Sequence, residues 1–319
     1  MKRIQPCFFD RFACIAGACT DSCCIGWEID IDKDSLAHYR AQTGEFGERL
    51  QREIVTEKGV SHFCLKEKER CAFLNEDNLC DLYIALGEDA LCDICREHPR
   101  FYEWFGDRVE AGLGLCCEEA CRLLLAEEAP LTFAETQDEQ PEEDFEGDEA
   151  WLELLQEARR NAFALLQDRS KTMEERLEGF MQLVNATQDE MDGFAPMEEY
   201  ETEVPDDAHL LALCGELEPI DESWTQRVKR METAQDRPVR IPEWKLEHAA
   251  VYLTYRWLLK AAFDGDALGK GRLVVTFVRL IGLLMRKGGA DSVEEALRIL
   301  SKEIEYSQEN TDAVQAWEL

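Results

Sequence analysis

The stretch Cys14-Ile-Ala-Gly-Ala-Cys19-Thr-Asp-Ser-Cys23-Cys24-Ile-Gly-Trp27 brings four thiols close together in the sequence. Thirteen of the fourteen cysteines fall between Cys7 and Cys121. A few intervening residues let a backbone turn bring two sulfurs to one metal, and ligation by thiolates alone selects zinc or an iron–sulfur cluster. The spacing therefore predicts a cysteine-ligated metal centre in this part of the chain.

Three more cysteine groups follow this stretch, namely Cys71-x8-Cys80, Cys92-x2-Cys95 and Cys116-Cys117. The chain has only five histidines, so thiols are the main candidate ligands. The sulfurs exceed the needs of one four-ligand site. Either two metal sites exist, or one site exists and the remaining thiols pack in the core. The spacing does not separate zinc from a [4Fe–4S] cluster.

The charge of the chain restricts its partners. A formal net charge of −33 and a pI near 4.5 repel nucleic acid and anionic lipid, and attract basic protein surfaces. The start of the chain lacks the apolar run of a signal peptide, and the most apolar run, Leu273 to Met285, is too short to span a bilayer. We expect a cytoplasmic protein with reduced thiols, and neither a nucleic acid nor a membrane partner.

The fold is predicted to be mostly α, with a loop-rich cysteine-ligated metal module followed by an α-helical domain. Composition divides the chain into a cysteine-rich module over 1–130, an acidic linker over 131–150 and a helical domain over 151–319. Apolar periodicity predicts helices within the last of these at 151–167, 243–263, 271–287 and 292–308, and another that begins at a capping box formed by Thr172 and Glu175. An acidic segment over 186–226 is expected to be irregular, since residues 177–226 contain no Lys or Arg and carry three prolines.

Several motifs resemble one known family. They are Phe12-Ala-Cys14, Asp21-Ser-Cys-Cys24-Ile-Gly-Trp27, Cys80-Asp-Leu-Tyr83, Tyr252-Leu-Thr-Tyr-Arg256 and Glu303-Ile-Glu-Tyr-Ser-Gln-Glu-Asn310. In these blocks the chain resembles the flagellin lysine N-methylase family, whose cysteine-rich part is related to small zinc- or iron-chelating proteins. The resemblance covers both ends of the chain and leaves out mainly the acidic middle.

The resemblance implies methyl transfer from S-adenosylmethionine to lysine side chains of flagellin, with a [4Fe–4S] cluster, or zinc as the alternative, in the site. It also implies a ligand pool of Cys14, Cys19, Cys23, Cys24, Cys71, Cys80, Cys92, Cys95 and Cys117. The cysteines at 7, 64, 116, 121 and 214 are additions of this chain, and within the pair Cys116-Cys117 we favour Cys117 as the ligand. The alternative function is that of a non-catalytic zinc- or iron-binding protein, for metal storage or delivery or as a structural scaffold.

Binding of the methyl donor is assigned to Arg96 and Arg100, which flank the Cys92–Cys95 pair. A guanidinium there can bind the donor carboxylate through two hydrogen bonds, or donate to cluster sulfurs. The alternative for either residue is a helix-end cation paired with Glu97 or Glu103. No G-x-G-x-x-G motif follows a predicted strand, and no residue is identified as the general base, so the catalytic residues stay unassigned.

Overall fold

A computed structural model describes residues 1–138, 144–201, 205–220 and 222–317. The chain forms two compact units: a smaller unit of residues 13–101 and 117–119, and a larger unit of residues 1–12, 102–116 and 120–319. These bounds differ from the division into 1–130, 131–150 and 151–319, because residues on both sides of the smaller unit contribute strands to the larger one. Residues 139–143, within the expected linker, lie outside the described residues.

The larger unit contains a four-stranded sheet in the order β4-β5-β1-β6. Its strands are β1 (Lys2–Pro6), β4 (Arg100–Phe105), β5 (Arg108–Leu113) and β6 (Phe133–Gln137). Strand β1 runs parallel to β5 and antiparallel to β6, with Lys2 opposite Gln137 and Pro6 opposite Phe133. The stretch expected to be a linker therefore begins as a paired strand. The strands are short and their partners lie far apart in sequence, so no local pattern indicated this sheet.

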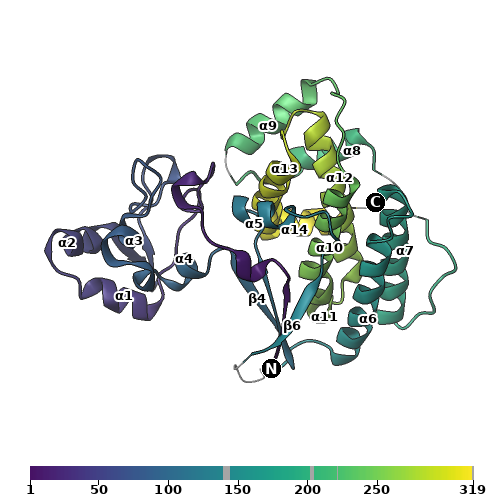
Figure 1. The fold of residues 1–319 in the computed structure, drawn as a ribbon, viewed down its shortest axis with the longest axis horizontal. Coiled ribbons are helices and arrows are strands. Elements are labelled where there is room, and N and C mark those ends of the chain that lie inside the picture. Colours follow the sequence, from purple (N-terminus) through teal and green to yellow (C-terminus); the bar gives the residue numbers. More distant parts are fainter. Residues whose placement is uncertain (139–143, 202–204, 221, 318–319) are drawn as a thin grey trace. The chain divides into compact units, whose positions relative to one another are not determined.

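The rest of the larger unit is helical, and the prediction of a mostly α protein is confirmed (Figure 1). Helix α12 is buried along most of its length and packs against α7, α8, α10, α13 and α14. No helix in the described ranges has the length and apolarity needed to cross a bilayer. The helices are α5 (Glu118–Leu124, which begins in the smaller unit), α6 (Glu149–Leu166), α7 (Met173–Met191), α8 (Asp207–Glu216), α9 (Glu222–Thr233), α10 (Glu243–Trp257), α11 (Ala261–Asp264), α12 (Ala267–Arg286), α13 (Val293–Leu300) and α14 (Gln308–Ala316).

Side-chain caps set where several of these helices begin. The predicted capping box is confirmed at α7: the backbone N–H of Thr172 donates to Glu175 at 2.7 Å, and the Thr172 hydroxyl accepts from the Glu175 N–H at 3.3 Å. The segment over 186–226 is more regular than expected, since α7 continues to Met191 and α8 and α9 follow. Both helices bury apolar side chains such as Leu210 and Trp224, which offset the acidity of the segment. Residues 202–204 and 221 of this segment lie outside the described residues.

Buried polar contacts join the helices to the sheet. Arg159 on α6 makes a two-bonded ion pair with Glu110 on β5, at 2.6 and 2.5 Å, and both side chains are buried. The Tyr255 hydroxyl on α10 lies 2.8 Å from the Ile4 carbonyl oxygen and 2.9 Å from that of Ala111. Because each of these groups would be costly to leave unpaired, the contacts fix the register between α6, α10 and the sheet.

The smaller unit consists of short elements joined by irregular segments. They are α1 (Lys33–Arg40), α2 (Gly44–Glu53), the hairpin β2 (Ile54–Glu57) and β3 (Val60–Phe63), α3 (Asp81–Leu86) and α4 (Asp93–Glu97). Its apolar core contains Tyr39, Leu50 and Phe73 together with the thiols of Cys71 and Cys92. The fold therefore places cysteines inside the core of this unit as well as at its surface.

We predict that Arg159→Met destabilises the larger unit by about 3–5 kcal/mol, because it leaves the Glu110 carboxylate buried without its partner. Chemical denaturation followed by circular dichroism measures this. The double variant Glu110→Leu/Arg159→Met should lose less stability than the single variant, since it leaves no charge buried without a partner. Arg11→Met, which breaks an exposed pair with Glu127, is the control and should cost under about 1 kcal/mol. Equal losses in the Arg159 and Arg11 variants would contradict the prediction.

Candidate metal centre

All nine cysteines of the expected ligand pool lie in the smaller unit. Of the other five, only Cys64 belongs to this unit, and Cys7, Cys116, Cys121 and Cys214 belong to the larger one. No disulfide joins any of the fourteen cysteines, all of which lie in the described part of the chain. The fold therefore gathers the thiols that the family pattern singles out and separates most of the others.

Five of the nine thiols form what we call the inner group: Cys24, Cys71, Cys80, Cys92 and Cys95. The backbone N–H of Cys71 donates to the Cys24 carbonyl at 2.8 Å, and Cys80 pairs with Leu74 in an isolated bridge. The thiols of Cys92 and Cys95 are hydrogen bonded to each other. Burial raises the pKa of Cys71 to about 12, and the nearby sulfurs of Cys24, Cys80 and Cys92 add to this rise.

The other four thiols, Cys14, Cys19, Cys23 and Cys117, form what we call the outer group. The Cys23 sulfur interacts with those of Cys14 and Cys117, and the Cys19 sulfur interacts with that of Cys117. Cys14 and Cys23 are exposed to solvent. The Glu118 carboxylate accepts hydrogen bonds from the Thr20 N–H at 2.8 Å and from the Cys19 thiol at 3.6 Å. The outer group thus joins residues near the start of the unit to its last segment.

Cys23 and Cys24 lie at the border between the two groups. Their thiols are hydrogen bonded, and this bond raises the pKa of Cys23 and lowers that of Cys24 to about 7. The Arg70 cation adds to the lowering at Cys24.

Backbone N–H groups point to several of these sulfurs from two or three residues further along the chain. The Ala16 N–H donates to the Cys14 sulfur at 3.4 Å. Such contacts favour the thiolate form and fix the direction of each sulfur, so they suit a metal ligand. The equivalent interactions are those of Asp21 with Cys19, Phe73 with Cys71, Leu82 and Tyr83 with Cys80, and the Cys95 N–H with Cys92.

The thiols approach one another without forming a complete coordination sphere. Within the described ranges, no three Cys, His, Asp or Glu side chains are arranged so that they could hold a metal ion. The donor set itself fits zinc or an iron–sulfur cluster, since every member of both groups is a thiol with a soft sulfur ligand. Coordination would require side-chain rotation within each group.

Arg96, one of the two expected donor-binding residues, makes local contacts at the end of α4. Its guanidinium pairs with Asp93 and, at 3.6 Å, with Glu97, and it donates to the Leu91 carbonyl at 3.2 Å. This arrangement matches the alternative of a helix-end cation. Arg100 is half-buried at the first position of β4. The described contacts of Arg96 include no cysteine sulfur, and the assignment of both residues to donor binding stays a prediction.

An aromatic residue lies beside the border between the groups. The Trp27 indole N–H donates to the Cys23 carbonyl at 2.7 Å, and its ring meets the edge of the His98 ring at a centroid distance of 5.6 Å. Burial lowers the pKa of His98 to about 4, so this imidazole is neutral at pH 7. Trp27 therefore fixes the backbone beside two of the candidate ligands.

Comparisons with known proteins identify relatives of this chain. It is 30% identical over 144 residues to "Flagellar biosynthetic protein FliU" of Salmonella muenchen, a match that covers 42% of this chain and 85% of that protein. The chain belongs to the flagellin lysine N-methylase family. It is also 31% identical over 144 residues to "Lysine-N-methylase" of Salmonella typhimurium, and 30% identical to that of Salmonella choleraesuis. Each of these two matches covers 42% of this chain and 36% of the relative, so the chain spans about a third of their length. No protein-family profile and no solved structure matches it.

In this member of the lysine N-methylase family, the adjacent residues Cys116 and Cys117 are separated by the fold. Cys117 belongs to the smaller unit and interacts with Cys19 and Cys23. Cys116 belongs to the larger unit, where its thiol is hydrogen bonded to the Tyr306 hydroxyl. The choice of Cys117 as the ligand stays a prediction.

Tyr306 is part of a polar cluster that the sequence did not indicate by spacing. Burial raises the pKa of Tyr306, so its phenol stays protonated. Beside it, the Glu305 carboxylate accepts from the Arg256 Nε at 2.7 Å and from the Trp257 indole at 2.9 Å. Glu305 ends the π-helical segment Ser301–Glu305, a local form common at functional sites. The only sequence signal was that Tyr306 and Arg256 both fall in family-like blocks.

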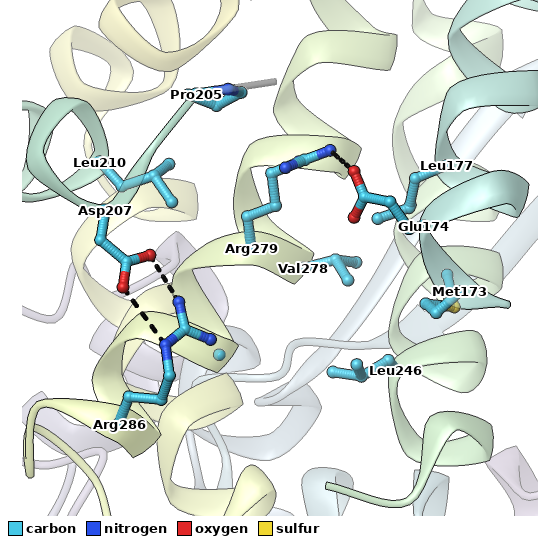
Figure 2. Close-up of a pocket in the computed structure, with 11 residues that line it drawn as sticks. Met173, Glu174, Leu177, Pro205, Asp207, Leu210, Leu246, Val278, Arg279 and Arg286 are labelled. Carbon is cyan, nitrogen blue, oxygen red and sulfur yellow. Dashed lines mark hydrogen bonds and ion pairs between the residues drawn. The ribbon is translucent and has the colours of Figure 1, made fainter. Parts of the chain in front are cut away.

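A pocket of about 220 Å³ lies in the larger unit between α7, α8, α10 and α12. Figure 2 shows Arg279 directed at Glu174 and Arg286 directed at Asp207, the latter pair at 2.5 Å. Each cation is thus balanced by its own carboxylate. The volume is also below the range of about 300–1,000 Å³ that is usual for cofactor sites. The pocket is therefore a weaker candidate site than the thiol groups.

We predict that Cys117→Ser lowers the metal retained by the purified protein, while Cys116→Ser leaves it unchanged. Serine removes one soft ligand from the outer group in the first case and a hydrogen-bond partner of Tyr306 in the second. Metal analysis after dialysis against a weak chelator should show a loss of affinity of at least about tenfold for Cys117→Ser. A similar loss of metal affinity in both variants would contradict the conclusion that only Cys117 lies among the candidate ligands.

Proposed function

We propose that this protein transfers methyl groups from S-adenosylmethionine to lysine side chains of flagellin, with a [4Fe–4S] cluster, or zinc, bound by the thiols of the smaller unit. The observation that carries this proposal is the match to proteins named lysine-N-methylase and flagellar biosynthetic protein. The collection of the nine expected ligands in one unit supports it. The reducing cytoplasm is the compartment in which such thiols persist.

The chemistry requires a neutral amine. The lysine nitrogen uses its lone pair to form a bond to the methyl carbon, the bond from that carbon to the sulfonium sulfur breaks, and one proton leaves the nitrogen. A lysine with a pKa near 10.4 needs between about 4 and 5 kcal/mol to lose a proton at pH 7. A bound iron–sulfur cluster would supply Lewis-acidic iron and the capacity for electron transfer. The protein must supply desolvation and a proton acceptor.

The acidic surface supports a lysine-bearing substrate. Between the end of α7 and the start of α8, the carboxylates of Asp192, Glu198, Glu199, Glu201 and Asp206 are exposed. They lie within residues 177–226, which contain no cation. We propose that this acidic segment attracts the positively charged surface of the substrate and raises the rate of encounter.

The central experiment is anaerobic purification followed by incubation with flagellin and S-adenosylmethionine, with mass spectrometry of the flagellin. Methylated lysines are expected, together with absorbance near 400 nm if the metal is an iron–sulfur cluster. Cys117→Ser is the matched variant and should lose activity in parallel with metal. If the metal-loaded protein neither binds S-adenosylmethionine nor modifies flagellin, the function is that of a non-catalytic zinc- or iron-binding protein.

We predict that Glu198→Gln/Glu199→Gln/Glu201→Gln raises the KM for flagellin roughly threefold to tenfold at low ionic strength without changing kcat, because it weakens electrostatic attraction. The difference from wild type should disappear in high salt. The control is Glu45→Gln/Glu48→Gln/Glu57→Gln, which removes three exposed carboxylates from the smaller unit. A salt-independent KM in the wild type would show that the acidic segment is only a solvated surface.

A further inference from the structure

We propose that the smaller unit holds two separate thiolate metal centres, an outer one formed by Cys14, Cys19, Cys23 and Cys117 and an inner one formed by Cys71, Cys80, Cys92 and Cys95. The inference rests on metal binding in the proposed function and is independent of methyl transfer. It assigns different tasks to the two centres. The inner centre stabilises the fold, and the outer centre is the one that external molecules can reach.

The number and neighbours of the sulfurs support two centres. Nine thiols exceed the four ligands that one zinc ion or one [4Fe–4S] cluster takes from protein. Among the thiols, Cys19 interacts with Cys117, whereas Cys71 interacts with Cys24, Cys80 and Cys92. Contact between the groups occurs through the adjacent residues Cys23 and Cys24. Cys24, which interacts with Cys71, Cys80 and Cys95, is the ninth thiol and lies outside both sets of four ligands.

The two groups differ in their surroundings. Cys71 and Cys92 are 6% and 0% exposed and belong to the apolar core that also contains Tyr39, Phe63 and Phe73. Cys24, Cys80 and Cys95 pack against the same core. The members of the outer group lie outside that core, and two of them are exposed. A metal in the inner group would therefore be enclosed, whereas one in the outer group would be open to solvent.

The path of the chain gives an independent argument for the outer centre. Residues 117–119 belong to the smaller unit, although the residues on both sides of them belong to the larger one. Three residues make few packing contacts, so specific bonds must hold them. Glu118 supplies two such bonds, accepting from the Thr20 N–H and hydroxyl at 2.8 and 2.5 Å. A metal ion bound by Cys14, Cys19, Cys23 and Cys117 would supply a third connection.

The different roles of the two centres follow from the burial of their ligands and from the positions of these ligands in the sequence. The inner ligands all lie between residues 71 and 95, so an inner metal organises one continuous part of the smaller unit, including the starts of α3 and α4. Because metal ligation and folding are coupled in small units, losing this metal should unfold the region. The outer metal closes a long loop from Cys23 to Cys117. Its loss should leave the core of the unit in place.

The test is the metal and sulfide content of the full-length protein after anaerobic purification. We expect two centres per chain, measured as two zinc ions, one zinc ion with one cluster, or two clusters. Cys14→Ser/Cys117→Ser should remove one centre, retain the other, and leave the thermal unfolding of the smaller unit nearly unchanged. Cys71→Ser/Cys95→Ser should remove the other centre and lower thermal stability. Cys64→Ser, in the same unit but outside both groups, is the control and should keep both.

One centre per chain in the wild type would overturn the proposal, and so would loss of all metal from the soluble Cys14→Ser/Cys117→Ser variant. If Cys71→Ser/Cys95→Ser is insoluble, chelation of the wild type decides the question. Two phases of metal release are expected, with the exposed outer centre first, and a single phase would contradict two centres. Two centres without flagellin methylation would support this inference and refute the proposed enzyme activity, so the failures of the two proposals are distinguishable.

Discussion

The smaller unit depends on sulfurs that are enclosed by apolar side chains. Cys71 and Cys92 occupy positions in the core where a charge is poorly solvated, and backbone N–H groups are directed at their sulfurs. An uncharged thiol can remain in such a core as a small apolar group, and a thiolate can remain there when a cation neutralises it. The short helices α3 and α4 begin directly after Cys80 and Cys92, so two of the candidate ligands lie at the starts of helices.

The larger unit is organised by a different interaction, since buried ion pairs connect helices that share a long apolar partner. Glu247 on α10 is fully buried and accepts from Arg169 at 2.8 and 2.9 Å and from Arg176 at 3.1 Å. Together with the Arg159–Glu110 pair, this contact gives the buried carboxylates of Glu247 and Glu110 cationic partners. This acidic protein thereby uses several of its arginines internally and leaves many carboxylates at the surface.

Sequence reasoning predicted the elements that depend on local patterns. The helical periodicity of α6, α7, α10 and α12 and the capping box at Thr172 were readable because their determinants lie within a few residues. The sheet was not, since β1 pairs with β5 and β6 more than a hundred residues away. Within the site, spacing identified the thiols, but only the fold divides them into inner and outer groups. Neither spacing nor composition could place Tyr306 beside Cys116, because the two residues lie far apart in the sequence.

The repeated passage of the chain between its units has a consequence for evolution and for protein engineering. Neither unit is a contiguous segment, so neither could have been gained or lost by a simple gene fusion at one junction. A fragment ending at residue 130 would contain β1, β4 and β5 but not β6, and would lack α6 and α10, which cover these strands through Arg159 and Tyr255. It would expose an unpaired strand edge and an unneutralised Glu110. Insertion of residues 13–101 into an existing larger fold, at the connection between β1 and β4, would account for most of the smaller unit, and residues 117–119 would then come from the larger fold itself.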